Sequence, residues 1–173
     1  MNPERLTDAR HEAGHATAAH LLGRRVILLS VEEEPFGSPC MEDRFPMEPL
    51  GHRHHPDAQW VNACDDVIIT LAGPLCADQE PAGLDLWQVE QILATVTDSE
   101  EEHEALSTAL RLRCEGMVKH PHFRAIHEHM TVALLREGVM RAPVIRNELE
   151  RAQFRYVNKP IDMETHTNGS SRN

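Results

Sequence analysis

Residues 11–15 of the sequence read HEAGH, which matches the pattern H-E-x-x-H. His11 and His15 are four residues apart, so on a helix both imidazoles project from one face and can bind one metal ion. Glu12 lies about 100° around such a helix from His11, where its carboxylate can reach a water on the metal. The spacing predicts a Zn²⁺ site with an activated water and Glu12 as the general base.

Two observations favour this prediction over a pair of ordinary surface histidines. A chain of this composition is expected to contain roughly 0.09 chance matches to the pattern. The second is Gly14, which lies inside the motif although a glycine within a helix costs about 1 kcal/mol relative to alanine. We therefore expect a neighbouring segment to approach the helix closely at Gly14.

A zinc site that keeps a water needs a third protein ligand, and the motif does not name it. The metzincin pattern continues with a glycine and a histidine at positions that hold Ala18 and Leu21 here. A carboxylate on a later helix is the expected ligand. Spacing alone leaves several candidates open: Asp65, Asp66, Asp78, Asp85 and Glu90.

Apolar periodicity and helix-boundary residues predict a mainly α domain with a small β-sheet beside the motif helix. The third predicted helix should turn Leu86, Val89, Ile92 and Leu93 inward, and Pro74 should bend or break the second helix. The expected helices run from Pro3 to a stop at Gly23, from Pro56 to about Ala77, from Leu86 to Val96, from a Ser99 cap to near Pro121, from Pro121 to Glu137, and onward from Pro143. A strand is expected at 26–31.

The remaining segments are expected to be loops. The stretch 34–56 is rich in proline and should form a long loop, with a second short strand near Gly51. We expect residues 1–156 to form one domain and 157–173 to be a disordered tail, because the tail has little apolar surface to bury.

The sequence resembles the FtsH-type zinc metallopeptidase family (M41), and the likeness covers about residues 5–152. It is carried by DARHEAGHATAAHLLG, by IITLAGPLCAD at 68–78, by GLDL at 83–86 and by the C-terminal helical segments. The resemblance implies a zincin-like fold in which His11, His15 and Asp85 bind zinc and Glu12 is catalytic. Asp78 stays open as an alternative to Asp85, because the segment between them is shorter than in the family.

The resemblance also implies an activity: hydrolysis of peptide bonds in flexible or unfolded polypeptides. The family's ATPase module contains a G-x-x-x-x-G-K-[ST] loop, and this sequence has none. We therefore expect an ATP-independent, stand-alone peptidase, with a separate ATPase or adaptor as a candidate partner. The alternative hypothesis is a zinc-binding regulatory or interaction module that uses the same scaffold without turning over substrates.

Composition excludes several other classes of function. The net charge of −11 argues against a general nucleic-acid binder, and no apolar run is long enough for a membrane span. No secretory signal is visible, so we expect a cytoplasmic protein whose four cysteines are free thiols. Nothing in the sequence specifies an oligomeric state.

The remaining charged and histidine-rich clusters are interpreted as surface groups. They are His52, His54 and His55 in the loop, the acidic run 32–34, and His120, His122, His127 and His129 around the start of the fifth helix. His20 lies on the motif helix but off the predicted ligand face. If the strand at 26–31 is an edge strand, a substrate peptide can pair with it.

Overall fold

Six helices and two short strands make up the described part of the chain, residues 2–31 and 56–157 of a computed structural model. The elements are α1 Pro3–Leu21, β1 Leu28–Ser30, α2 Pro56–Cys76, α3 Gly83–Leu93, α4 Glu100–Lys119, α5 Pro121–Glu137, β2 Val139–Arg141 and α6 Ala142–Val157. The prediction of a mainly helical chain with a small sheet is confirmed. The expected strand near Gly51, the acidic run, the loop histidines and the tail beyond Val157 lie outside the described residues.

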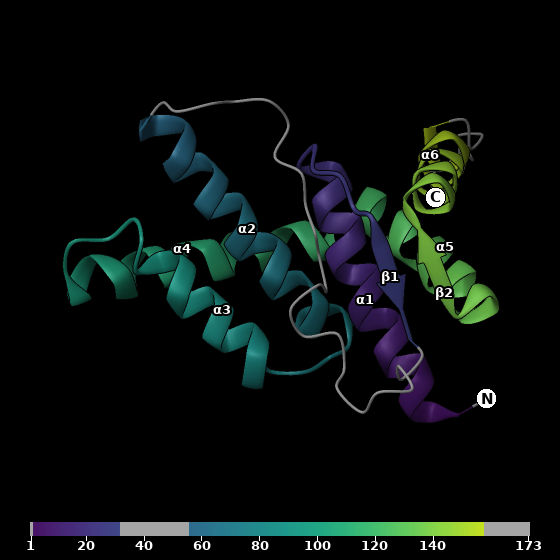
Figure 1. The fold of residues 1–173 in the computed structure, drawn as a ribbon, viewed down its shortest axis with the longest axis horizontal. Helices are drawn as coiled ribbons and strands as arrows, with labels where there is room; N and C mark the ends of the chain where they lie inside the picture. Colours follow the sequence, from purple (N-terminus) through teal and green to yellow (C-terminus); the bar gives the residue numbers. More distant parts are fainter. Residues whose placement is uncertain (1, 32–55, 158–173) are drawn as a thin grey trace, which may run out of the picture.

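The motif helix α1 lies at the centre of the molecule, between α2 on one side and α5 on the other (Figure 1). Helices α3 and α4 pack beyond α2, and α6 packs beyond α5. None of the helices in the described part of the chain is long and apolar enough to cross a lipid bilayer. The arrangement places α1 in contact with elements from both halves of the sequence.

Several helix boundaries follow from local capping chemistry. The Asn2 side chain accepts a hydrogen bond from the Glu4 amide (3.1 Å) at the start of α1. Ser99 accepts from the Glu102 amide at the start of α4, and the Glu102 carboxylate accepts in return from the Asp98 amide. These caps were predictable because each involves residues within four positions of one another.

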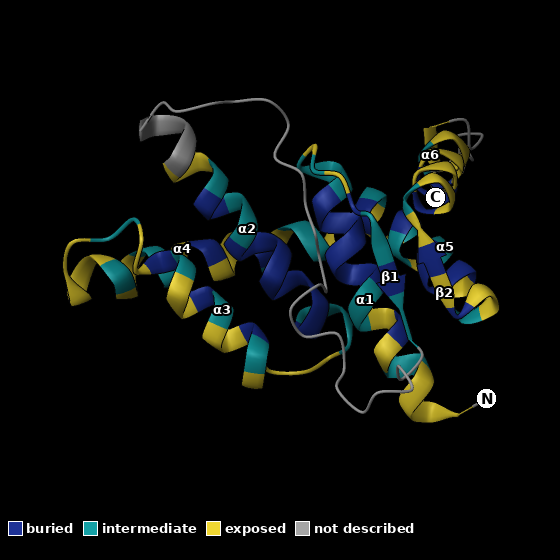
Figure 2. Cartoon of the chain, in the orientation of Figure 1, coloured by how far each residue is buried: buried dark blue, intermediate teal, exposed yellow. Residues whose placement is uncertain are grey.

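Small residues on α1 allow its neighbours to approach closely. Buried alanines, including Ala9, Ala13 and Ala16, cover the faces of α1 that meet α2 and α5. Larger side chains on the surrounding helices fill the remaining space, and the buried residues are concentrated on α1 and the adjoining part of α2 (Figure 2). This packing holds α1 rigidly, since interiors at this density leave little room for side chains to shift.

The small sheet pairs β1 with β2, antiparallel, in the register Leu28↔Arg141, Leu29↔Met140 and Ser30↔Val139. Sequence periodicity did not predict β2, because three residues between two helices are too few to show an alternation. Burial of Leu29 and Met140 at the centre of the ladder, each 1% exposed, explains why the pair forms. Within the described residues the sheet has only these two strands, so the other edge of β1 pairs with no described strand.

Helix α2 continues through Pro74 to Cys76, close to its predicted end near Ala77, so the proline does not break it. One sequence prediction about α3 is corrected. Helix α3 begins at Gly83 rather than Leu86 and turns Leu86 outward, 45% exposed. Its buried positions are Asp85, Val89 and Leu93. Four-residue spacing puts these three on one face, so a carboxylate occupies a core-facing position of the helix.

Candidate metal centre

His11 and His15 lie side by side on α1, as their spacing predicts. Their Nε2 atoms are 2.9 Å apart and their ring centroids 4.6 Å apart. The His15 side chain is 1% exposed, whereas that of His11 is 14% exposed. The His15 imidazole is therefore in the core, whereas the His11 imidazole is partly accessible to solvent.

Asp85 approaches both imidazoles from the first turn of α3. Its Oδ2 lies 3.2 Å from His11 Nε2, and its Oδ1 lies 3.9 Å from His15 Nε2. The helix begins at Gly83, whose φ of 57° is in the left-handed region that favours glycine. Asp85 lies in the first turn of this helix, faces His11 on α1 and is 7% exposed.

The other carboxylates that spacing left open lie elsewhere. Asp66 forms an ion pair with Arg24, and Glu90 pairs with His103 at 2.8 Å. Asp78 is exposed and has a φ of 55° in the turn after α2. The pKa of Asp65 is raised above its usual value, because the effect of burial outweighs that of the nearby charges of Arg113 and Arg24. Among the described residues, His11, His15 and Asp85 form the one cluster of three side chains that could hold a metal ion.

The donor set and its spacing fit zinc. Two imidazole nitrogens and one carboxylate oxygen are typical of catalytic zinc sites. Bonds of about 2.0–2.1 Å in tetrahedral geometry place neighbouring ligand atoms about 3.3 Å apart. The three observed separations of 2.9, 3.2 and 3.9 Å lie on both sides of that value.

A hydrogen bond from α2 sets the tautomer of His15. His15 Nδ1 lies 2.7 Å from the carbonyl oxygen of Ile69. A carbonyl oxygen can only accept, so Nδ1 carries the hydrogen, and in the neutral ring Nε2 is the nitrogen with the lone pair. That lone pair belongs to the atom nearest His11 and Asp85. The same arrangement orients and tunes histidine ligands in known metal sites.

Two glycines allow α1 and α2 to approach at the site. A Cβ on Gly14 would lie 2.7 Å from the Ala72 carbonyl oxygen and 2.9 Å from Cys76 Cβ. The close approach predicted at Gly14 is therefore confirmed. A Cβ on Gly73 would lie 2.2 Å from His15 Nε2, so the ring fits only beside a residue without a side chain.

Glu12 lies next to His11 on α1 and is partly exposed. It is not a member of the His11–His15–Asp85 cluster. His20 also lies apart from the cluster, and its Nε2 hydrogen-bonds to Gln153 Oε1 at 2.9 Å.

Sequence reasoning missed the contacts that hold α1 in place from α2 and α5. His127 Nε2 donates to the Arg10 carbonyl oxygen at 2.9 Å, next to His11 in the sequence. Burial lowers the pKa of His127, which favours the neutral ring. Of the four histidines interpreted as surface groups, His120 is exposed, and His122, His127 and His129 are partly exposed. The sequence does contain a signal for the close contact at Gly73, because a glycine within a helix lowers its helix propensity.

Cys64, Cys76 and Cys114 are free, as predicted, and Cys40 lies outside the described residues. No model of a known protein family matches the chain, and no curated protein is similar enough in sequence to be matched.

Proposed function

We propose that this chain is a zinc-dependent peptidase with a zincin-like fold similar to that of FtsH-type peptidases. The convergence of His11, His15 and Asp85 from two helices carries the proposal. A buried carboxylate that faces two imidazoles is costly unless a cation or a proton shared with them compensates its charge. Zn²⁺ would supply that compensation and would be held by these three side chains.

Bound zinc would polarise the substrate carbonyl and lower the pKa of water to about 7. Glu12 has the position of a general base, because it follows the first ligand on the helix and is partly exposed. Its carboxylate would accept a proton from the attacking water and return it to the departing amine. The Ile69 carbonyl would hold the His15 ring in one orientation during both steps.

The substrate proposed is a flexible or unfolded polypeptide. The edge of β1 that faces away from β2 has backbone groups with no described strand beside them. An extended peptide could add to this edge, and β1 contacts the helix that carries His11 and His15. A separate ATPase or adaptor would be needed only for folded substrates.

Glu12→Gln tests the catalytic proposal directly. The variant should keep about one zinc per chain and the wild-type melting temperature. Its cleavage of unfolded casein and of a mixed peptide library near neutral pH should fall by about 10²–10⁴-fold. Glu4→Gln is the matched control, because Glu4 is exposed in the first turn of the same helix. It should cleave at the wild-type rate.

Other outcomes would contradict the proposal in distinguishable ways. If the wild-type protein and Glu12→Gln both bind zinc but neither cleaves any substrate, the result would favour the alternative function, a non-catalytic zinc-binding module. Equal activity in the two proteins would show that Glu12 is not the base. Less than about a tenth of an equivalent of zinc, even after zinc is supplied, would remove the metal site itself.

A further inference from the structure

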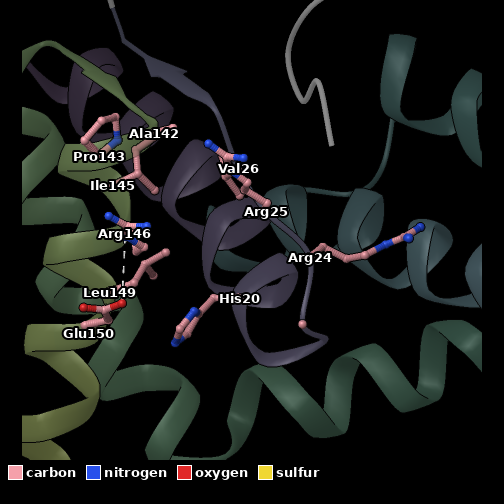
Figure 3. A pocket seen from close by; sticks show the side chains of 11 residues that line it. His20, Arg24, Arg25, Val26, Ala142, Pro143, Ile145, Arg146, Leu149 and Glu150 are labelled. Atoms are coloured by element: carbon pink, nitrogen blue, oxygen red, sulfur yellow. Dashed lines mark ion pairs between the residues drawn. The ribbon is translucent and has the colours of Figure 1, made fainter. Parts of the chain in front are cut away.

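Histidines hold the C-terminal end of α6 against α1 and α5. The His20 side chain points from α1 toward α6 (Figure 3), and its Nε2 donates to Gln153 Oε1 at 2.9 Å. The His122 ring, near the start of α5, stacks on Tyr156 of α6 with ring centroids 4.6 Å apart and planes at 22°. One histidine from each neighbouring helix therefore contacts this end of α6.

The position of the His122 ring favours its neutral form. Its Nε2 is buried and has no hydrogen-bond partner among the described residues. In a neutral imidazole one nitrogen carries no hydrogen, whereas both nitrogens of an imidazolium are donors. A buried donor without an acceptor costs free energy, and a buried charge costs more. Protonation of Nε2 would therefore disfavour the contact with Tyr156 that the structure shows.

His120 is the N-cap of α5, and this role also needs a neutral ring. Its Nδ1 accepts a hydrogen bond from the His122 amide at 3.2 Å. Protonation would turn Nδ1 into a donor and remove the cap. It would also add a positive charge at the N-terminal end of the helix, where the helix dipole is itself positive. The first turn of α5 is thus built on two histidines that are suited to their places when neutral.

The charged groups close to His122 are basic. In the helix turns that adjoin its ring, the charged or titratable residues are His20, Lys119, His120, Arg124, Arg155 and Tyr156. None of these six is a carboxylate, and Glu150, further back on α6, pairs with Arg146. Burial, followed by the charges of His120 and His20, lowers the pKa of His122 below its usual value of 6.5.

The middle of α6 is held by a contact that responds differently to acid. His129 Nε2 lies 2.7 Å from Glu148 Oε2, and a protonated His129 can keep this hydrogen bond while the carboxylate is ionised. Burial alone would raise the pKa of Glu148, but the bond from His129 and the charge of Arg151 hold it below its usual value of 4.5. This contact should therefore survive at pH values at which His122 becomes charged.

We propose that the end of α6 is an acid-sensitive latch, in which protonation of His120 and His122 releases residues 153–157 from α1 and α5 while Glu148 keeps the rest of the helix in place. The stability that neutral His122 contributes is complete above pH 6.5 and is lost as the pH falls through its lower folded pKa. His20 also lines a pocket of about 520 Å³ between the turn after α1 and the start of α6 (Figure 3). Release of Gln153 from His20 would change the wall of that pocket.

Hydrogen exchange of the full chain, corrected for the intrinsic exchange rate at each pH, tests the latch. Between pH 7 and pH 5 the protection of amides 153–157 should fall by at least about tenfold, because the open form binds protons more tightly. Protection of amides 147–150 should change by less than about twofold, since Glu148 stays ionised. An NMR titration of the His122 ring should give a pKa below 6.5.

His120→Asn with His122→Phe removes both titrating rings and keeps their contacts. Asparagine is among the best N-cap residues, and phenylalanine can stack on Tyr156 without a buried nitrogen. The protection of amides 153–157 in this double variant should differ by less than about twofold between pH 7 and pH 5. His103→Gln is the matched control, because His103 pairs with Glu90 at 2.8 Å on other helices. It should keep the wild-type response.

Three results would overturn the proposal. The first is that protection of 153–157 in the wild-type protein does not change between pH 7 and pH 5. The second is that it falls equally in the double variant, which would assign the response to other groups, including those of the metal centre. The third is that protection of 147–150 falls as much, which would mean that acid opens α6 as a whole. No readout depends on zinc or on cleavage, so the result is independent of the proposed peptidase function.

Discussion

The His15 ring lies in the space that a side chain at Gly73 would need. A Cβ at residue 73 would come within 2.2 Å of Nε2 and 2.5 Å of Cε1. The carbonyl oxygen of Ile69, one helical turn earlier, accepts the hydrogen bond from the Nδ1 of the same ring. A single turn of α2 therefore provides both the space for this imidazole and the partner that orients it.

Gly73→Ala should disrupt the metal centre. The added methyl overlaps the ring, so His15 must rotate away or α1 must separate from α2. Loss of an orienting contact at a metal ligand typically costs about 10–100-fold in metal affinity. We expect at least that reduction for Zn²⁺, measured by competition with a chromophoric chelator, although alanine has the higher helix propensity.

Gly116→Ala provides the control for this prediction. Gly116 also lies within a helix, α4, and a Cβ there would meet nothing within 4 Å. This substitution should leave zinc affinity unchanged and raise the free energy of unfolding by about 0.5–1 kcal/mol. Wild-type zinc affinity in Gly73→Ala would show that the ring does not need the position that the structure gives it.

Asp85→Asn should lose zinc binding, whereas Asp78→Asn should not. Both substitutions remove a negative charge and keep the side-chain shape, but only Asp85 lies beside His11 and His15. Asparagine also tolerates the left-handed backbone of residue 78. Elemental analysis should give about one equivalent for Asp78→Asn and below about a tenth for Asp85→Asn. The opposite pattern would mean that the loop before α3 places Asp78 at the site.

Glu148→Gln should destabilise the packing of α6 against α5. Burial alone would raise the pKa of Glu148, but the hydrogen bond from His129 (2.7 Å) and the charges of Arg151 and Arg136 hold it below its usual value of 4.5. Stability from such a group is present above pH 4.5 and is lost as the pH falls through the lower folded pKa. We expect a cost of about 1–3 kcal/mol at pH 7 in urea unfolding.

The pH dependence of stability distinguishes the contribution of the Glu148 charge from that of side-chain packing. The stability difference between wild type and Glu148→Gln should shrink as the pH falls below 4.5. Glu150→Gln is the control on the same helix, because its carboxylate is 64% exposed and should contribute within about ±0.5 kcal/mol. A difference for Glu148→Gln that stays constant from pH 7 to pH 3 would contradict the assignment.

Cys76 and Cys114 should resist alkylation in the folded protein. Burial raises the pKa of each thiol to about 12, so the thiolate, which is the reactive form, is scarce at pH 8. We expect iodoacetamide to modify both at least about 100-fold more slowly than in urea. Mass spectrometry of the two peptides measures this, and rapid modification of the native protein would show that the helices open at this position.

Several features of the protein follow from residues that are close in the sequence. The HEAGH spacing puts His11 and His15 on one face because a helix repeats every 3.6 residues. The Asn2 and Ser99 caps depend on amides two or three positions away. The close approach of α2 to α1 is possible because Gly14 has no side chain. Such features need only local hydrogen bonds and local spacing, so they could be predicted without the fold.

The tertiary structure decided which of the five candidate carboxylates lies beside His11 and His15. It also decided that β1 pairs with β2. Asp85 meets His11 because α3 packs on α2, which brings together residues that no local rule connects. The apolar pattern predicted that Leu86 would face inward, but Asp85 is buried and Leu86 is 45% exposed, because packing against α2 selects the buried face of α3. Contacts between distant segments depend on the packing of whole helices, and the periodicity of any one helix does not contain that information.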